Sequence, residues 1–219
     1  ERNTIAQTRT IRSMAVSKDG SSVYTGNIQS PNVSTNAIRR VSSGILAVPG
    51  TDHVIFGNGM PGGTGGFGQV GGQPVYAGGG TGTFLNWAAT PNSPVSMDTD
   101  DRGYLYAAFS SSISPANIVR IYSADLSTIY GVLSISGPLG VAVQKIGSDY
   151  FMFVTDGNIL RKYNVSNLPA IVQDMSYSPP PMTGGVGLVV DKDGVAFVTG
   201  NNQVRRVSAN GTTITHTVT

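Results

Sequence analysis

One short pattern recurs along this chain and restricts its possible folds more than any other feature of the sequence. It consists of Asn, any residue, an apolar residue, Arg, any residue, an apolar or aromatic residue, and then Ser or Asn. The pattern is found at residues 36–42, 117–123, 158–164 and 202–208. Repetition of this kind indicates similar structural units arranged side by side, each supplying part of a shared core.

A second pattern fixes the length of the unit. Residues 14–27 and 188–201 both contain an apolar strand, a Lys-Asp-Gly turn, a second strand and a Thr-Gly-Asn end. Asp-Gly favours a tight hairpin because glycine accepts positive φ. First strands begin near Ala15, Met97, Val141 and Val189, which gives spacings of 82, 44 and 48 residues. The first spacing is close to two units, so a degenerate unit is expected between the first two strands.

Units of this length are typical of four-stranded propeller blades. Short β-branched and aromatic runs such as Val195–Val198 indicate strands, and no amphipathic helical pattern is present. We therefore predict an all-β fold: a single β-propeller domain over residues 1–219 with about five four-stranded blades. The expected blades cover residues 13–49, 50–93, 94–137, 138–182 and 183–219, with residues 3–12 as a closing or extra outer strand.

Two stretches resemble NHL repeats. They read VGLVVDKDGVAFVTGNNQVRRVS at residues 186–208 and GPLGVAVQKIGSDYFMFVTDGNILRKYNV at residues 137–165. The resemblance implies a β-propeller, but it implies no particular activity, because propellers carry many unrelated functions. Two units depart from the pattern: the second lacks the Arg strand, and the first has a ten-residue insertion before it.

Composition narrows the classes of function. Only 12% of residues are charged, and the net charge of +2 is spread along the chain, which argues against nucleic-acid binding. No apolar run is long enough to insert into a membrane. Absence of cysteine excludes disulfides, zinc–thiolate sites and thiol nucleophiles. This polar β composition favours an extracellular, cell-surface or virion location.

Catalytic and metal sites find little support in the sequence. His53 and His216 are the only histidines, and Gly-x-Ser-x-Gly does not occur. The segment Asp98–Gly103 resembles a calcium loop, but Arg102 stands where an oxygen ligand is needed. The segment also aligns with the Lys-Asp-Gly turns, which is the preferred interpretation. We expect no enzyme activity, no cofactor and no bound metal.

Two further features have both an architectural and a functional interpretation. The repeated arginines could form an anion-binding ring, but a residue that recurs from repeat to repeat more often makes its hydrogen bonds within its own blade. The repeated arginines are Arg39, Arg120, Arg161 and Arg205. The glycine-rich run Gly57–Gly82 has no phosphate-loop lysine and opens no helix. It is interpreted as a plain connection, with a binding loop as the alternative.

The longest and most irregular loops are expected together on the face opposite the Asp-Gly turns. They are Asn27–Asn36, part of Gly57–Gly82, Ser110–Ala116 and Ser178–Gly185. Trp87, the only tryptophan, is either a core residue or an exposed platform for a sugar. The candidate ligand- or partner-binding residues are Asn27, Gln29, Asn32, Phe67, Trp87, Ser112, Tyr177 and Met182.

These observations favour a non-enzymatic binding or scaffold module of a surface, secreted or virion assembly. Protein partners or assembly neighbours are expected. A carbohydrate-binding lectin is the alternative, and a propeller lyase or hydrolase is a third class. Thr4–Ile11 and Thr213–Val218 both read as outer strands, so one of them is expected to complete the last blade or to pair with another chain.

Overall fold

The computed structural model describes residues 9–29, 37–42, 69–70, 73–74, 87–89, 94–110, 117–179, 181 and 184–217. Every helix-or-strand element in these residues is a β-strand, which confirms the all-β prediction. The described part of the chain contains no helix that is long and apolar enough to cross a membrane.

Four antiparallel sheets of four strands make up most of the described structure. The first contains β1 (Arg9–Val16), β2 (Ser22–Gln29), β3 (Ala37–Ser42) and β6 (Trp87–Ala89). The second contains β7 (Ser96–Thr99), β8 (Leu105–Phe109), β9 (Ile118–Tyr122) and β10 (Ile129–Ser134). The third contains β11 (Gly140–Ile146), β12 (Asp149–Thr155), β13 (Leu160–Asn164) and β14 (Val172–Gln173). The fourth contains β15 (Gly187–Val190), β16 (Ala196–Gly200), β17 (Gln203–Val207) and β18 (Thr213–Thr217).

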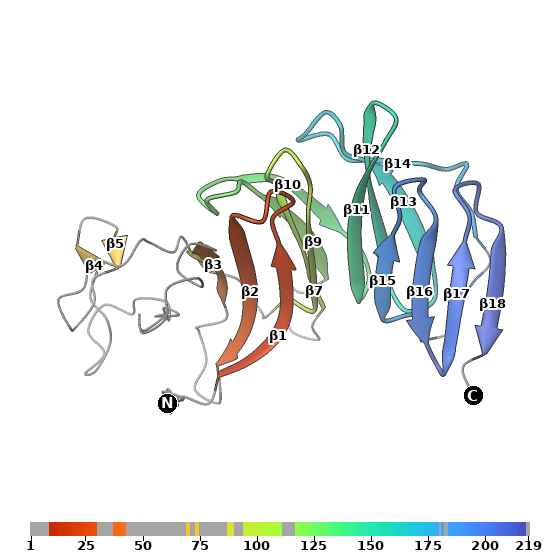
Figure 1. Ribbon diagram of the computed structural model, residues 1–219, viewed down its shortest axis with the longest axis horizontal. Coiled ribbons are helices and arrows are strands. Elements are labelled where there is room, and N and C mark those ends of the chain that lie inside the picture. The colour runs from red at the N-terminus through yellow and green to blue at the C-terminus, as the bar shows by residue number, and fades with distance from the viewer. Residues whose placement is uncertain are drawn as a thin grey trace.

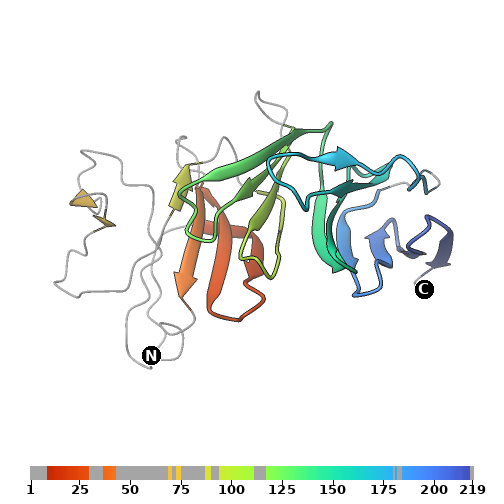
Figure 2. The same ribbon diagram turned by 90° about the horizontal axis from the view of Figure 1, so that it is seen from above.

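The sheets follow one another along an open arc, as Figures 1 and 2 show from two directions. Their first strands lie next to one another in the order β1, β7, β11, β15. In Figure 1, β1 and β15 stand apart, with β7 and β11 between them. Four-stranded sheets stacked around a common axis by their first strands form the blades of a β-propeller, and the chain has this fold.

Apolar residues fill the three seams between successive sheets. Each strand alternates its side chains, so one face of a sheet packs on the sheet before it and the other on the sheet after it. The largest buried side chains of the first seam are Tyr24, Ile38, Leu105, Phe109 and Tyr122. Those of the second seam include Tyr106, Val119, Ile121, Val141 and Met152. The third seam contains Phe153, Leu160, Tyr177, Ala196 and Val198.

Polar side chains of β7 also hold the backbones of both neighbouring first strands. Thr99 Oγ1 donates to the Val16 carbonyl of β1 at 2.7 Å. Asp98 Oδ2 accepts the Val143 amide of β11 at 2.8 Å. These bonds satisfy backbone groups on first-strand edges that no strand pairs with.

Gly26 of β2 packs tightly against Pro94, which precedes β7. A Cβ atom on Gly26 would lie 2.3 Å from Pro94 Cγ. Ser13, opposite Gly26 on β1, donates its hydroxyl to the Pro94 carbonyl at 2.7 Å. Only a residue without a side chain fits here.

The predicted repeat is confirmed for the inner strands and needs correction for the second blade. Val141–Val143 and Leu188–Val190 lie in β11 and β15, as expected. Residues 87–89, assigned to a separate blade over residues 50–93, instead pair with β3 and complete the first sheet. The other described residues of that range form the small ribbon of β4 (Gln69–Val70) and β5 (Gln73–Pro74). The rest of the expected blade lies outside the described residues.

Of the two segments predicted as outer strands, the N-terminal one lies in an inner strand and the C-terminal one is an outer strand. Arg9–Ile11 continue into β1, where they pair with Asn27–Gln29, so they belong to an inner strand. A register shift between Ile11 and Ser13 lets β1 run on in one long pairing with β2. Thr213–Thr217 form β18, the outer strand of the last sheet. Residues 1–8 lie outside the described part of the chain.

Candidate functional site

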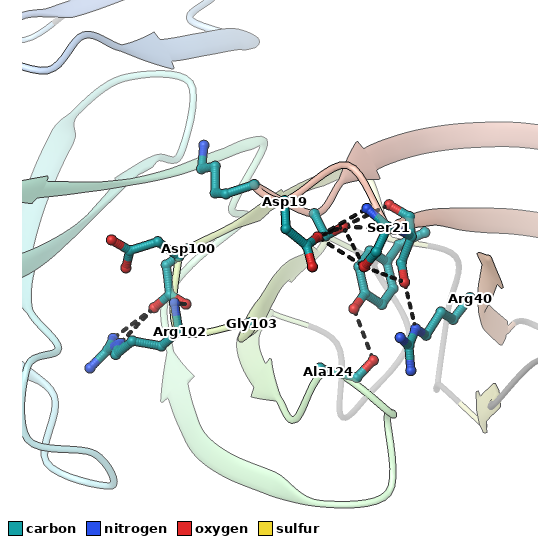
Figure 3. Close-up of a pocket in the computed structure, with 12 residues that line it drawn as sticks. Asp19, Ser21, Arg40, Asp100, Arg102, Gly103 and Ala124 are labelled. Atoms are coloured by element: carbon teal, nitrogen blue, oxygen red, sulfur yellow. Dashed lines mark hydrogen bonds and ion pairs between the residues drawn. The ribbon is translucent and has the colours of Figure 1, made fainter. Parts of the chain in front are cut away.

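Turns that join the first and second strands of each sheet emerge on one side of the arc, which we call the hairpin face. Two adjoining hollows open there, of about 230 and 270 Å³. Both are lined by Lys18, Asp100 and Asp101. The first hollow lies between the β1–β2 and β7–β8 turns (Figure 3), and the second reaches β11 and Tyr150.

The β1–β2 turn is held rigid by its own polar side chains. Asp19 accepts hydrogen bonds from the hydroxyls of Ser17 and Ser21, at 2.6 and 2.9 Å, and from the Ser21 amide (Figure 3). The Ser17 hydroxyl, followed by the Ser21 groups, lowers the pKa of Asp19 to about 2. A turn of this kind presents its carboxylate in a fixed position at any physiological pH.

The same turn recurs in the second sheet. Asp125 accepts from the hydroxyls of Ser123 and Ser127 at 2.6 and 2.8 Å. The two turns face each other, because Tyr24 of β2 donates its hydroxyl to the carbonyl of Ala124 at 2.8 Å (Figure 3). One wall of the first hollow is therefore tied directly to the opposite wall.

The floor between the hollows is a network centred on Arg102. Its guanidinium binds the buried Asp100 carboxylate at 2.8 Å. It also donates to the carbonyls of Val165 and Ser166, which follow β13 of the third sheet, at 3.2 and 3.1 Å. Asp100 also accepts the Tyr106 hydroxyl at 2.9 Å. Burial and the nearby Asp100 carboxylate raise the pKa of Tyr106. The network joins two sheets and leaves the Asp100 carboxylate fully engaged.

Tyr150 closes the second hollow. Its ring lies 3.7 Å from the Arg102 guanidinium, and its hydroxyl donates a short hydrogen bond to Asp101. This hydrogen bond is the main cause of a Tyr150 pKa raised to about 12. Lys145 lies 5.4 Å from the centre of the same ring. The tyrosine is thus neutral at physiological pH and fixed between a cation and a carboxylate.

Asp98 lies beside the hollows on β7 and pairs with Lys18 at 3.6 Å. Burial raises its pKa, against the opposing effects of the Val143 amide and the Lys18 ammonium. Because Lys18 stands in the first sheet and Val143 in the third, Asp98 contacts both neighbours of its own sheet. Its role in this structure is to connect them.

The carboxylates that line the hollows are already engaged by hydrogen bonds. The three carboxylates among the described lining residues all accept hydrogen bonds from the fold: Asp19, Asp100 and Asp101. Among the described residues, no group of three His, Cys, Asp or Glu side chains is placed to hold a metal ion. Asp98 and Thr99 end β7, and Asp100–Gly103 form the β7–β8 turn, as the alignment with the Lys-Asp-Gly turns predicted.

Of the repeated arginines, those with described contacts bond within their own sheets. Arg161 pairs with Asp156 at 2.6 Å, and Arg205 donates to Gln203 at 3.1 Å. The Arg120 guanidinium lies 5.9 Å from the Phe109 ring of its own sheet. The contacts of these three residues agree with the architectural interpretation.

The residues predicted to bind a partner are mostly beyond the reach of the structure. Tyr177 is an exception: it is 5% exposed and packs edge-on against Phe153, so it is a core residue and is not presented to a partner. The backbones of Asn27, Gln29 and Trp87 lie in β2 and β6, but their side chains are not described. The predicted residues outside the described chain are Asn32, Phe67, Ser112 and Met182.

Three lining residues were missed by sequence reasoning: Lys18, Asp101 and Tyr150. The first two were seen only as turn residues. A usable signal existed in the Ser-x-Asp-x-Ser pattern at residues 17–21 and 123–127, which marks rigid turns on one face. Of the histidines, His53 lies outside the described residues, and only the backbone of His216 is described.

Comparison with solved structures supports the fold. The chain is similar to a putative gluconolactonase (14% identity, TM-score 0.56) and to a gluconolactonase from Xanthomonas campestris (13%, 0.53), covering 94% of itself and 62% and 61% of those chains. It is also similar to the WD40 repeats of RRP9, with 10% identity, a TM-score of 0.55, and coverage of 96% of itself and 52% of that chain. No protein-family model matches the sequence, and no curated protein is similar to it in sequence. At these identities the likeness establishes a β-propeller, and the chain spans about half to three fifths of the length of the matched structures.

Proposed function

We propose that this protein is a non-enzymatic binding module that recognises a protein partner through the hairpin face, as part of a surface, secreted or virion assembly. The observation that carries the proposal is that the carboxylates lining the hollows are already hydrogen-bonded. Asp19 and Asp100 accept hydrogen bonds within their own turns, and Asp101 accepts the hydroxyl of Tyr150 in β12. A general base needs a carboxylate or imidazole that is free to take a proton from substrate, whereas a docking surface needs fixed polar groups.

The surface around the hollows has the character of a polar protein interface. Side chains of both signs stand on neighbouring turns, including Lys18 and, further along the arc, Lys192 with Asp193. Tyr150 and Lys145 add an aromatic ring and a long cationic side chain at the second hollow. Tyrosine is enriched where protein interfaces are tightest, and mixed charges favour selection among partners.

A photo-crosslinking experiment tests the binding role. A photoreactive amino acid placed at Lys18 is expected to give a discrete cross-linked product in the native assembly or host extract. The matched control is the same amino acid at Val172, an exposed position on the outer strand β14 of the third sheet. Products of equal yield from both positions, or none from Lys18, contradict recognition through the hairpin face.

Lactone hydrolysis is the rival to test first, because two of the similar structures are described as gluconolactonases. Hydrolysis of δ-gluconolactone is followed by pH-stat, with and without added divalent cations. We expect no acceleration over the uncatalysed rate. A rate that rises with the wild-type chain and falls for Asp98→Asn contradicts the non-enzymatic proposal.

A further inference from the structure

The fourth sheet carries a seam surface against which none of the described sheets packs. In the third sheet, Ala142 and Phe153 lie opposite each other and face the fourth sheet, with exposures of 4% and 0%. The corresponding pair in the fourth sheet is Val189 and Phe197, which are also opposite each other. Val189 is 63% exposed. The sequence has thus built an apolar seam that the described structure leaves open.

The correspondence extends across this face of the fourth sheet. Thr155 and Leu160 pair at the third seam and are buried. Their counterparts Thr199 and Val204 pair in the same way, with Thr199 exposed and Val204 half-buried. We call this surface the trailing face; its members are Val189, Phe197, Thr199 and Val204.

The first sheet carries the complementary half of a seam. Ala15 and Tyr24 are buried against the second sheet, so Met14 and Val16, which alternate with Ala15, point to the opposite side. Met14 is 61% exposed, although its counterpart Met97 in the second sheet is 7% exposed. We call this surface the leading face; it consists of Met14, Val16 and the half-buried Val23, which pairs with Val16.

The two faces are the two sides of one repeated contact. At the third seam, positions like Val189 and Phe197 pack against positions like Met14 and Val16, namely Leu188 and Val190 of the next sheet. A trailing face therefore fits a leading face in the way that successive sheets already fit each other. The two faces stand at opposite ends of the arc (Figure 2), so they cannot meet within one chain.

We propose that the trailing face of one copy of this chain packs on the leading face of a second copy, and that two copies close one propeller ring. Head-to-tail contact between two arcs forms two identical seams and leaves neither face open, which is the closed arrangement for such a contact. This assembly goes beyond the proposed binding role and does not depend on which partner the hairpin face recognises.

Analytical ultracentrifugation of the 219-residue chain gives the first test. We expect a species of twice the 22.7 kDa chain mass. Val189→Asp buries a charge in the seam and should weaken association roughly 100-fold or more. The matched control is Val132→Asp, on the exposed rim strand β10, which should keep the wild-type mass. Circular dichroism should show both variants folded, because both positions are exposed in a single copy; if Val189→Asp misfolds, Val189→Ser replaces it.

Mixing distinguishes a head-to-tail seam from any other dimer. Met14→Asp should also give single copies. A mixture of Val189→Asp and Met14→Asp chains places both charges in one seam and leaves the other seam intact, so a two-copy species should return with reduced affinity. The proposal is overturned if the wild-type chain is a single copy, if Val189→Asp leaves its mass unchanged, or if the mixture stays dissociated. A mass that grows without limit with concentration overturns ring closure.

Discussion

The third sheet is joined to its two neighbours by different means. Its seam with the second sheet combines an apolar core with the Arg102 network, whose guanidinium crosses to the carbonyls of Val165 and Ser166. Its seam with the fourth sheet is mainly apolar. At its edge Thr155 Oγ1 donates to the Gly185 carbonyl at 3.3 Å, and the Gly185 amide donates to the Gly157 carbonyl at 3.0 Å. Apolar burial is strong but without direction, whereas hydrogen bonds fix angles. The comparison indicates that the second seam fixes the angle between its two sheets, whereas the third seam stabilises the fold mainly by apolar burial.

The largest effect is expected from emptying the apolar seam. Phe153→Ala should reduce the free energy of unfolding by about 3–5 kcal/mol, because the ring is fully buried and leaves a cavity. Phe197→Ala, at the corresponding but half-buried position, should cost less than about half as much. Urea denaturation at low protein concentration measures both. Equal losses would show that the two positions are not equivalent in burial.

Removing Arg102 tests how much the polar network contributes to the second seam. Arg102→Ala leaves the Asp100 carboxylate, 2% exposed, without its cation, and should cost about 3 kcal/mol. Arg102→Lys should recover only part of this, since one ammonium cannot replace the planar set of donors. Lys192→Ala, which breaks an exposed pair with Asp193, is the control and should cost less than about 0.5 kcal/mol. If Arg102→Ala behaves like the control, the network does not support the seam.

A smaller loss of stability is expected when the Thr155 hydrogen bond at the third seam is removed without changing the packing. Thr155→Val keeps the side-chain shape but removes the bond to Gly185 and the acceptor for the Gly157 amide. We expect a loss of about 1 kcal/mol in thermal or urea unfolding. Thr199→Val, the exposed counterpart, should change stability by less than about 0.5 kcal/mol. A larger loss from Thr199→Val contradicts the assignment of the trailing face as open in single copies.

The smallest change in stability is expected for Asp174, an acidic residue at the rim of the third seam. The Ser176 hydroxyl, with Lys162 at 3.1 Å, lowers the pKa of Asp174. A lowered pKa means that its stabilisation is present above the ordinary aspartate range and is lost as pH falls through the folded-state value. Asp174→Asn should therefore be less stable than wild type by about 0.5 kcal/mol at pH 7. The difference should vanish near pH 2; a constant difference across pH contradicts a role for the charge.

The fold could be predicted because its determinants are local. Val141–Val143 and the Asp193-Gly194 turn are visible as a strand and a hairpin in the sequence itself, and both are found in the structure. The assignment of Trp87–Ala89 was wrong because a three-residue strand carries no pattern that names its partner. Pairing with β3 is decided in three dimensions, across a long stretch of chain.

The site could not be predicted for a related reason. Arg102 binds Val165 and Ser166 only because the second and third sheets meet at a particular angle. In the sequence, Arg102 is one residue of an ordinary turn, and Tyr150 is one aromatic residue in a strand. The trailing face was easier to predict from the sequence, because the repeat alone is enough to align Phe197 with Phe153.

The contact between Gly26 and Pro94 restricts how this protein can change over generations. Any side chain at residue 26 collides with the proline ring, so even alanine pushes the first two sheets apart. Replacement of Pro94 by a smaller residue removes the collision with the ring, and the Ser13 hydroxyl, 2.6 Å from the same Cβ position, must then turn away before residue 26 can carry a side chain. The two positions therefore form an ordered pair in which Pro94 must be replaced first, and in any set of descendants a residue other than glycine at 26 should be accompanied by the loss of proline at 94.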